Sequence, residues 1–448
     1  MILDQAHVNR IFLPATYAEG VPYELFRELR SAAPVWWVEE PAVGPWPAGP
    51  GYWAVLRHAD VKHVLRSPDV FSSHLGATQI RDPDSSADLD FARTMMLNQD
   101  PPDHSRLRRI VAGAFTPRAL RELAVGIEHH AAAAVREVRA QGEADIVRLV
   151  ADLPVRTLAC IMGVPEQDRR LLQDWANRVI GYQDADYAHS STVDPAALTD
   201  AGRAALAHRP TTWTAPDGRP VNPRSRAALA DMFAYAHALA ERPRPGSMLA
   251  RMREGGLGTA EFETMFFLFA VAGNETVRNA LPGGLYSLLS HPEQYRLLLR
   301  WPDSAAPAAP VASVAPVASA VEEMLRYWPP VVDFRRTAAQ DVELGGRRIR
   351  RGEKVVVYHA SANRDETVFP DPDRFDVTRT PNDHVSFGYG PHFCVGAQLA
   401  RLQMTAMLGS LLTELPELTL APGAAPDRMV SNFQNGLKHL HVRWRPRG

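Results

Sequence analysis

The long apolar stretch at residues 259–281, TAEFETMFFLFAVAGNETVRNAL, constrains the fold more than any other part of the sequence. Its pattern predicts a helix that begins at Thr259, with Glu261 and Glu263 in the first turn, where acidic side chains are favourable. In its middle, AGNET contains a glycine, an acid and a threonine, which each lower helix propensity or resist burial, so tertiary structure must compensate. A helix that passes through a polar pocket would explain them. Pro282, followed by two glycines, predicts a kink or an early break of this helix.

The other local signals predict more helix than strand. Residues 118–142, RALRELAVGIEHHAAAAVREVRAQG, are rich in strong helix formers and end at a glycine. Strands are expected in GYWAVLRH, which begins at Gly51, and in residues 342–358, where a Gly-Gly pair indicates a hairpin. We therefore expect a mainly α protein with a minor β part.

Two irregular regions interrupt this pattern without dividing the chain. Residues 304–320, SAAPAAPVASVAPVASA, form an Ala/Pro-rich connector whose first half is too rich in proline for a regular helix. Residues 189–226 mix a short helical piece with turn signals such as Pro-Asp-Gly. Because neither region resembles a linker between independent units, we expect residues 1–448 to form a single domain.

Composition excludes several classes of protein. With 2 cysteines in 448 residues, a disulfide framework is excluded and a reducing compartment fits best. The net charge of -2 gives no reason to expect nucleic-acid binding. The first residues lack the pattern of a secretory signal, and no apolar run is long enough to predict a membrane span. We therefore expect a soluble, cytoplasmic protein.

One of the two cysteines lies in a glycine-rich turn, FGYGPHFCVGAQLAR, at residues 387–401. A helix pattern follows Cys394, so backbone N–H groups at the helix start would point at the sulfur and favour its thiolate. That geometry suits a thiolate ligand to a haem iron, because Gly396 and Ala397 let a flat macrocycle lie close to the backbone. Phe387 could cover the sulfur from solvent. A buried, inert cysteine is the alternative, and it is our interpretation of Cys160, in RTLACIMGVP.

The spacing F-G-x-G-x-H-x-C-x-G resembles the haem-binding loop of the cytochrome P450 family. The resemblance implies that Cys394 is the axial ligand of the iron of haem b (iron protoporphyrin IX). It also implies that Phe387, Gly388 and Gly396 contact the cofactor, and that the haem lies between the long central helix and the helix after the cysteine loop. Four motifs occur in the order that the family requires, and family-like segments run from about residue 20 to the end of the chain.

The centre of the long helix matches the family pattern A-G-x-[DE]-T at Ala272, Gly273, Glu275 and Thr276. The resemblance implies that these are the catalytic residues. Gly273 would make room for dioxygen, and the Thr276 hydroxyl would hydrogen-bond it. Glu275 would help to deliver protons for O–O cleavage, a form of general-acid catalysis.

A third motif, SAVEEMLRYWPP, places Glu323 and Arg326 on one helix face, where they can pair. Such a pair is weak evidence alone, because it is common on helix surfaces. It gains weight from FPDPDRFD, about 50 residues later, in which Arg374 could join the pair. The resemblance implies a network of Glu323, Arg326 and Arg374 that supports the fold behind the cysteine loop.

A fourth motif, QDPPDHSRLRRIVAGAFTPR, places His104 and Arg108 four residues apart, so that both can reach one anion. The resemblance assigns them to the haem propionates, together with Arg336 and with His392, two residues before the cysteine. The neighbouring arginines are interpreted as a solvated face or a docking surface, because a positive patch would attract an acidic redox protein.

The resemblance implies a monooxygenase that activates O₂ and hydroxylates, or otherwise oxidises, a bulky hydrophobic small molecule. The chain contains no flavin or iron–sulfur segment, so electrons from NAD(P)H must come through a ferredoxin and a ferredoxin reductase. Two alternatives stay open. The same haem chemistry could serve ring closure, C–C coupling or oxidative decarboxylation of a peptide or polyketide. The chain could also be a non-catalytic haem-binding protein, although the Glu275–Thr276 pair argues against it.

The sequence indicates the chemical class of the substrate but not its identity. The motifs at 99–118 and 272–280 look similar to actinobacterial members that oxidise sterol side chains or branched lipids. Residues 189–226 look longer than in those enzymes and predict an extended lid, with Trp213, which favours a bulky or carrier-held natural product such as a macrolide or a peptide. Residues 72–96, with Phe91, are expected to form another wall of the substrate pocket.

Overall fold

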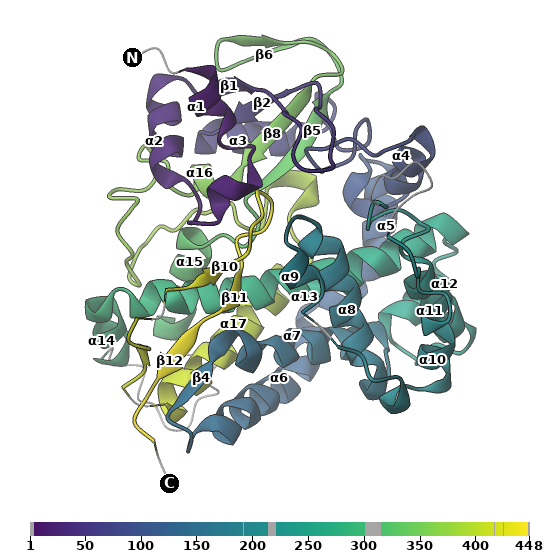
Figure 1. Ribbon diagram of the computed structural model, residues 1–448, viewed down its shortest axis with the longest axis vertical. Helices are drawn as coiled ribbons and strands as arrows, with labels where there is room; N and C mark the ends of the chain where they lie inside the picture. The colour runs from purple at the N-terminus through teal and green to yellow at the C-terminus, as the bar shows by residue number, and fades with distance from the viewer. Residues whose placement is uncertain are drawn as a thin grey trace.

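The computed structural model describes residues 4–190, 192–213, 221–300, 315–415, 417–423 and 425–446 (Figure 1). The mainly α fold class is confirmed, since helices form most of the molecule. The α-helices are α1 (Gln5–Asn9), α2 (Tyr23–Ala32), α3 (His58–Arg66), α4 (Ser86–Arg93), α5 (Asp103–Ala112), α6 (Pro117–Val138), α7 (Ile146–Met162), α8 (Arg169–Ile180), α9 (Ala185–Ala188), α10 (Asp200–Leu206), α11 (Ala230–Glu241), α12 (Met248–Glu254), α13 (Thr259–Leu289), α14 (Pro292–Arg300), α15 (Ala315–Tyr327), α16 (His359–Ala362) and α17 (Ala397–Glu414).

A five-stranded mixed sheet and three small sheets make up the β part. The large sheet has the order β1-β2-β8-β5-β3, in which only β2 and β8 pair in parallel. Its strands are β1 (Val35–Val38), β2 (Tyr52–Val55), β3 (Phe71–Ser72), β5 (Asp333–Ala338) and β8 (Lys354–Tyr358). The small sheets contain β4 (Glu143–Asp145), β6 (Val342–Leu344), β7 (Arg347–Ile349), β9 (Thr419–Leu420), β10 (Asp427–Arg428), β11 (Leu437–His439) and β12 (His441–Arg443). The expected Gly-Gly hairpin is the turn between β6 and β7, where both glycines have positive φ.

Helix α13 crosses the middle of the molecule between the large sheet and helices α6, α7 and α17 (Figure 1). It runs through Pro282 to Leu289, so the expected early break is wrong. The two glycines after the proline explain why. A Cβ at Gly283 would lie 2.0 Å from the Trp328 indole nitrogen, and one at Gly284 would lie 2.4 Å from Met324 Cε. Because α15 and Trp328, the residue after it, pack this closely on α13, burial compensates for the hydrogen bond that the proline removes.

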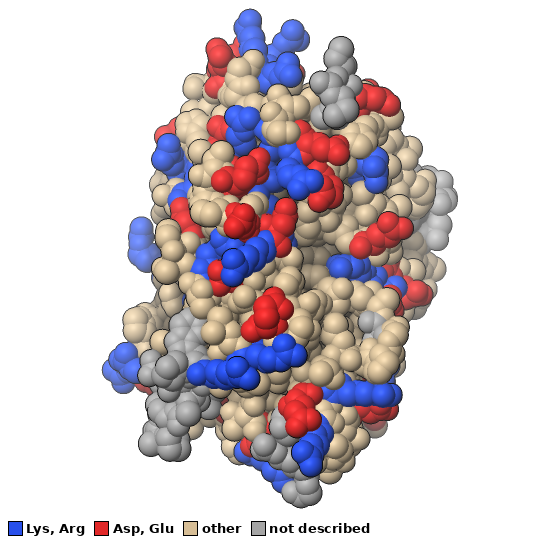
Figure 2. Space-filling model, turned by 90° about the vertical axis from the view of Figure 1, so that its left-hand side faces the viewer, with Lys and Arg blue, Asp and Glu red and all other residues tan. Residues whose placement is uncertain are grey.

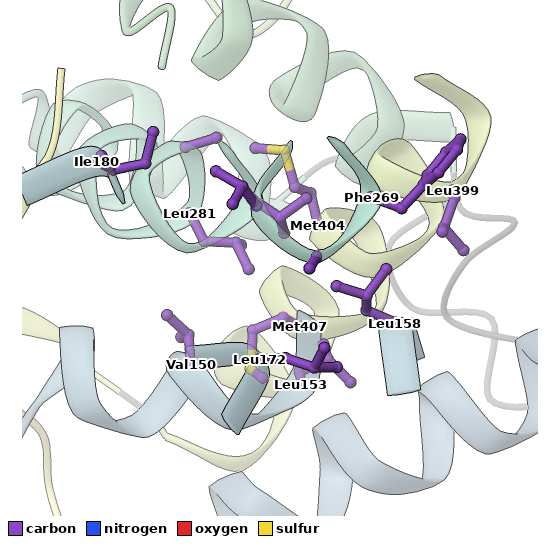
Figure 3. Close-up of a cluster of buried hydrophobic side chains, with 14 of the residues drawn as sticks. Val150, Leu153, Leu158, Leu172, Ile180, Phe269, Leu281, Leu399, Met404 and Met407 are labelled. Carbon is purple, nitrogen blue, oxygen red and sulfur yellow. The ribbon is translucent and has the colours of Figure 1, made fainter. Parts of the chain in front are cut away.

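Four helices share one hydrophobic core, in which leucine, methionine and phenylalanine side chains interdigitate (Figure 3). Helix α7 contributes Leu153 and Leu158, and α8 contributes Leu172, all of them buried. Side chains of α13 and α17 close the core from the other side; Met404 and Met407 of α17 are fully buried. The packing fixes α13 and α17 relative to each other, and these are the helices that carry the two sequence motifs expected to flank a haem.

Three other expectations have mixed outcomes. Residues 118–142 do form a helix, α6, which ends at Val138. Cys160 lies on α7, as expected, but it is exposed, so its assignment to the core is wrong. Of the connector at 304–320, residues 304–314 lie outside the described residues, and the rest begins helix α15.

The region at 189–226 is described only in part, because residue 191 and residues 214–220 lie outside the described ranges. Its short helical piece is α10, Asp200–Leu206. No helix in the described ranges combines the length and the hydropathy that crossing a bilayer requires. On the face shown in Figure 2, basic and acidic side chains are interspersed, in keeping with the small net charge.

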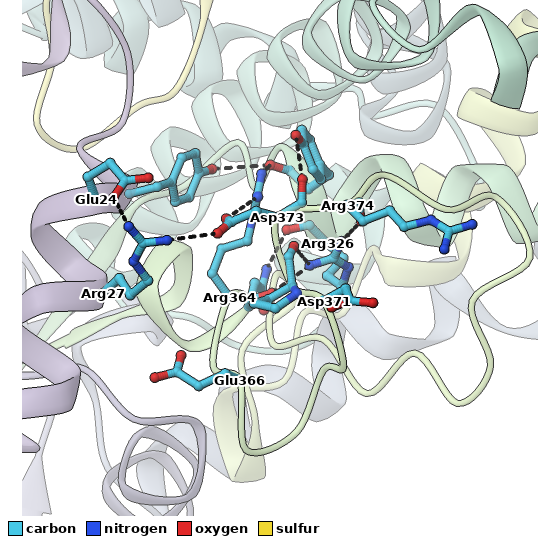
Figure 4. Close-up of polar contacts among 12 residues, drawn as sticks. Glu24, Arg27, Arg326, Arg364, Glu366, Asp371, Asp373 and Arg374 are labelled. Atoms are coloured by element: carbon cyan, nitrogen blue, oxygen red, sulfur yellow. Dashed lines mark hydrogen bonds and ion pairs between the residues drawn. The ribbon is translucent and has the colours of Figure 1, made fainter.

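Glu323 and Arg326 of α15 form a buried ion pair, and both side chains are 0% exposed. The guanidinium of Arg326 donates to both carboxylate oxygens, at 2.8 and 2.7 Å. The structure corrects the expected third member. Arg374 contributes only its backbone carbonyl, which accepts from Arg326 at 3.1 Å, while its own side chain points away (Figure 4). The second guanidinium at Glu323 belongs to Arg379, at 3.3 Å, because the turn at residues 371–379 brings that side chain back to the pair.

The ion pair is linked to the segment that precedes the cysteine loop. Arg326 donates to the carbonyl oxygen of Asn363 at 2.9 Å. The Asn363 side chain in turn donates to Ser386 Oγ at 2.7 Å and accepts from the backbone N–H of Val385 at 2.8 Å. Because Phe387 follows directly, a buried charge on α15 fixes where the glycine-rich turn begins.

We expect Glu323→Gln to lower the free energy of unfolding by about 3–5 kcal/mol, since it leaves two buried guanidinium groups without their anion. Urea denaturation monitored by far-UV circular dichroism measures the change. Glu343→Gln is the control, because Glu343 lies exposed on β6 and should alter stability by less than about 0.5 kcal/mol. Equal midpoints for the two variants would contradict a structural role for the pair.

Candidate functional site

The glycine-rich turn is held closed by backbone hydrogen bonds and by close packing. The N–H of Cys394 donates to the carbonyl oxygen of Phe387 at 2.9 Å. Gly388 and Gly390 both have φ near +70°, a conformation that favours glycine. A Cβ at Gly390 would lie 2.6 Å from the carbonyl oxygen of Leu65, so any larger residue would push the turn away from α3. The glycines of the motif are therefore required by the shape of the loop.

The thiol of Cys394 lies at an open position of the cysteine loop. It is accessible to solvent, yet the protein around it is dense enough that burial raises its pKa. The N–H of Gly396, at the start of α17, and the guanidinium of Arg108 act in the opposite direction and lower the pKa. A Cβ at Gly396 would come only within 3.9 Å of Phe115, so space is open on this side of the sulfur. The sequence prediction that backbone N–H groups point at the sulfur is confirmed for Gly396.

Phe387 lies half-buried beside the cysteine loop. Its ring centroid is 6.3 Å from that of Phe393, and the Arg401 guanidinium lies 4.5 Å over it. Arg401 is itself held by Glu322, at 2.6 and 2.8 Å. Phe387 is thus fixed against the helix that follows the cysteine, in a position to shield one side of the sulfur.

On α13, the AGNET segment opens the buried middle of the helix. Ala272 is exposed and Thr276 is half-buried, although their neighbours Val271, Asn274 and Glu275 are buried. The Thr276 hydroxyl donates to the carbonyl oxygen of Ala272 at 2.9 Å. Because both residues lie in the middle of the molecule, the space they face is internal.

That space is a cavity of about 410 Å³, within the range of small-molecule sites. Its wall is mostly apolar, with Phe267 and Leu268 of α13 next to Phe334 and Phe433. The expected second wall at residues 72–96 is confirmed, since Phe91 and its neighbours line the cavity. From the region at 189–226, the described residues 222, 224 and 225 also line it.

Trp213, which the sequence placed in the lid, is not among the lining residues; it lies next to Arg178, whose guanidinium is 5.6 Å from its ring. Two lining residues that the sequence gave no reason to select are Arg81 and Tyr182. Neither lies in a motif, and the chain brings them to the cavity from separate segments. Only the fold could have revealed them.

Glu275 is fully buried beside the cavity and is held by three neighbours. The phenol of Tyr187 donates to its carboxylate, and Arg278 lies 3.3 Å from it. The amide of Asn274 is at 3.5 Å. Burial raises the pKa of Tyr187 well above its ordinary value, so this phenol keeps its proton. Sequence reasoning missed Tyr187, because nothing local marks a tyrosine 88 positions away as a partner of Glu275.

The four basic residues expected to bind propionates meet in one cluster. The rings of His104 and His392 lie 4.1 Å apart. Arg336 is buried and donates to the carbonyl oxygen of Arg335, and Arg108 donates to that of Phe393 at 2.6 Å. Burial, reinforced by the neighbouring positive charges, lowers the pKa of His104 to about 4 and that of His392 to about 2. Burial also lowers the pKa of Arg336 to about 10.

This cluster fits a dianionic group. No carboxylate lies within ion-pair distance of any of the four basic residues in the described part of the chain, and Nδ1 of His104 has no hydrogen-bond partner. Buried cations without anions are unfavourable, and two carboxylates would remove the penalty. A thiol that faces open space, a basic cluster beside it and an exposed Ala272 on α13 together suit a haem with its propionates on the cluster.

Comparison with known proteins agrees with this geometry. The family model described as Cytochrome P450 matches residues 246–435. The chain is 35% identical to the Steroid C26-monooxygenase of Mycobacterium tuberculosis, with 96% of this chain and 91% of the relative covered. It is 34% identical to the Methyl-branched lipid omega-hydroxylase of the same species, with 94% and 90% covered.

A solved structure supports the same assignment at the level of the fold. The Mycobacterium marinum cytochrome P450 in complex with pseudoionone superposes with a TM-score of 0.77 at 33% identity, covering 99% of this chain and 98% of the other. Members of the family bind haem and take electrons from NAD(P)H, generally through ferredoxin-type partners. The chain belongs to the cytochrome P450 family and is an oxidoreductase of the monooxygenase class.

Proposed function

We propose that the chain holds haem b through Cys394 and hydroxylates a hydrophobic small molecule in the cavity beside α13. The observation that carries the proposal is the environment of Cys394, whose sulfur faces open space and receives the N–H of Gly396 and the charge of Arg108. When bound, the haem supplies the activation of dioxygen. The protein supplies the axial thiolate, the anchoring of the cofactor, the proton path and the position of the substrate.

The anchoring role belongs to His104, Arg108, Arg336 and His392. The guanidinium charges of Arg108 and Arg336 lie beside the two histidine rings with no carboxylate at ion-pair distance among the described residues, so the propionates of a haem would complete the cluster. Gly388 and Gly396 keep the backbone of the loop close enough for a flat macrocycle, and Phe387 shields the sulfur from water. Shielding of a thiolate from solvent and from extra hydrogen bonds tunes the reduction potential of the metal that it binds.

Thr276 and Glu275 are the residues to which we assign proton delivery. The Thr276 hydroxyl faces the cavity, and its proton is held by the carbonyl oxygen of Ala272. Glu275 lies one residue before it, with its carboxylate held by Tyr187 and Arg278 behind the cavity wall. A rotation of the Glu275 side chain toward Thr276 would carry a proton from that network to the threonine hydroxyl.

The substrate and the partners are assigned by class. A mostly apolar cavity favours a lipid-like substrate, as do the relatives that act on a steroid and on a methyl-branched lipid. Ring closure, C–C coupling or decarboxylation stays a second outcome of the same chemistry. A ferredoxin with its reductase would dock beside the cysteine loop, where Phe393 is 41% exposed near Arg106 and Arg109. A single domain over residues 1–448 and a cytoplasmic location stay predictions.

We expect Cys394→Ser to abolish the red-shifted Soret band of the reduced, CO-bound protein, because the iron loses its thiolate. A CO difference spectrum measures this directly. Cys160→Ser is the matched control, since the other cysteine is exposed on α7, and it should leave the band unchanged. A thiolate-type band in Cys394→Ser would show that a different residue binds the iron.

We expect Thr276→Ala to uncouple turnover, so that product formed per NAD(P)H consumed falls by about tenfold or more and peroxide rises. The variant lacks the hydroxyl that faces the cavity but keeps the apolar wall. Product, NAD(P)H and peroxide are measured in one reaction with added redox partners. Thr276→Ser is the control, because it retains the hydroxyl. Unchanged coupling in the alanine variant would place the proton path elsewhere.

We expect Arg108→Gln to release haem about 10–100-fold faster, because one charge-assisted hydrogen bond to a propionate is lost. The rate of haem transfer to excess apomyoglobin measures the loss. Arg109→Gln is the matched control, since Arg109 is the next residue of α5 but is exposed. Equal transfer rates for the two variants would remove Arg108 from the cofactor site.

A further inference from the structure

Two arginines line the cavity without an acidic partner. The guanidinium of Arg224 lies 4.7 Å over the ring of Tyr182 and 5.8 Å over that of Phe433. Arg81 donates to the carbonyl oxygen of Pro47 at 2.9 Å. In the described ranges, neither guanidinium lies within ion-pair distance of a carboxylate, and the guanidinium of Arg224 donates no hydrogen bond.

The acids of the same wall do not balance these charges. Three of them are bound to basic groups that do not line the cavity: Glu40 to Lys354 at 2.7 Å, Asp82 to Arg335 at 2.5 Å and Glu275 to Arg278 at 3.3 Å. The other two are Asp84, which is exposed, and Asp88, which is half-buried, and both lie beyond ion-pair distance of the two arginines. Neither arginine therefore has an ion-pair partner among the acids of the wall.

The two arginines converge on Tyr182. Burial raises the pKa of this phenol, while the charges of Arg224 and Arg81 act to lower it, so both guanidiniums lie within electrostatic reach of its oxygen. Burial lowers the pKa of Arg224 and of Arg81, and in Arg81 it outweighs the opposing charge of Glu40. Tyr182 keeps its proton and adds a hydroxyl donor to the two guanidiniums.

A substrate that fills the cavity changes the hydration of the guanidinium groups of Arg81 and Arg224. Water can hydrate the guanidinium groups while the cavity is open, but an apolar ligand would displace that water and leave two buried charges unpaired. A ligand with an anionic end would instead pair with them, and the low dielectric would strengthen the pairing. The part of the cavity around Arg81, Tyr182 and Arg224 is therefore expected to bind anionic ligands more tightly than neutral ones.

We propose, on the basis of the proposed function, that the substrate is a long apolar molecule with a free carboxylate. The carboxylate binds Arg224 and Arg81, with Tyr182 as a third donor, and the apolar chain runs along the phenylalanine wall to Ala272 and Thr276. A carboxylate matches the two-pronged guanidinium geometry. Because Arg224 is enclosed between two aromatic rings, a compact carboxylate inside the cavity fits it better than a phosphodiester on a carrier protein outside.

The experiment is an optical titration of the holoenzyme with three probes that share one chain: tetradecanoic acid, methyl tetradecanoate and S-tetradecanoyl phosphopantetheine. Displacement of water from the iron shifts the Soret band to the high-spin position, and the midpoint gives Kd. We expect the acid to bind at least about tenfold tighter than the ester. Arg224→Gln and Arg81→Gln should each remove most of this preference and leave the Kd of the ester unchanged.

Arg348→Gln is the control, because Arg348 is exposed on the β6–β7 hairpin and its side chain pairs with Asp341. It should retain the full preference for the acid. Equal Kd values for acid and ester in the wild type, or no shift with the acid, would overturn the inference. A preference for the phosphopantetheine thioester that is lost in Arg224→Gln would also overturn it and assign the arginines to a carrier.

The CO difference spectrum of the same preparations distinguishes failure of the carboxylate-site proposal from failure of the proposed haem-thiolate function. A thiolate-type band without any preference for the acid refutes the carboxylate site alone. Absence of the band in the wild type refutes the proposed haem-thiolate function, whatever binds in the cavity. If Arg224→Gln does not fold, the comparison of acid with ester in the wild type and in Arg81→Gln still decides the question.

Discussion

The ion pair between Glu323 and Arg326 is the interaction on which the rest of the site depends. Two fully buried charges are unfavourable unless every donor and acceptor is satisfied. Here Glu323 also receives the N–H of Asp376 at 2.8 Å, and Arg326 donates to the carbonyl oxygens of Asn363 and Pro372. The pair thus joins α15 to the irregular stretch before the cysteine loop. Irregular backbone has no ladder of its own hydrogen bonds, so a buried charge supplies the partners that a strand or helix would have provided.

The sequence predicted features that depend on local geometry. The turn around Cys394 and the N–H of Gly396 at its sulfur follow from glycine positions and from the start of a helix, which are both local. The prediction that the Arg374 side chain joins the ion pair was wrong. The guanidinium that reaches Glu323 is that of Arg379, which the chain brings there only after it turns back. Residue spacing in the sequence does not predict such a turn. The expected break at Pro282 was wrong because the packing of Trp328 on Gly283 and of α15 on Gly284 outweighs one lost hydrogen bond.

Residues far apart in sequence were predicted only where a family resemblance supplied the link. Spacing indicated that His104 could share an anion with Arg108, but nothing in the sequence showed that its ring lies 4.1 Å from that of His392. Neither sequence spacing nor the family resemblance predicted that Tyr187 lies beside Glu275. The same is true of Tyr182 and its neighbours Arg81 and Arg224. Such contacts depend on how helices pack on one another, and the hydrophobic periodicity of one sequence does not predict that packing.

Three groups of basic side chains in the described part of the chain have different partners, and the difference separates structure from function. Arg326 has its anion in the chain, bound at 2.7 Å, and is structural. The cluster of His104, Arg108, Arg336 and His392 has no carboxylate at ion-pair distance among the described residues, and burial, with the neighbouring positive charges, lowers the pKa of both histidine rings. Arg224 likewise has none. Because the fold provides a buried carboxylate for Arg326, it could also provide one for the other basic groups. A single mutation to an acidic residue would be enough. Cations that are left unpaired where a cavity or an open space reaches them are therefore best explained by anions that arrive with a ligand, the cofactor in one case and the substrate in the other.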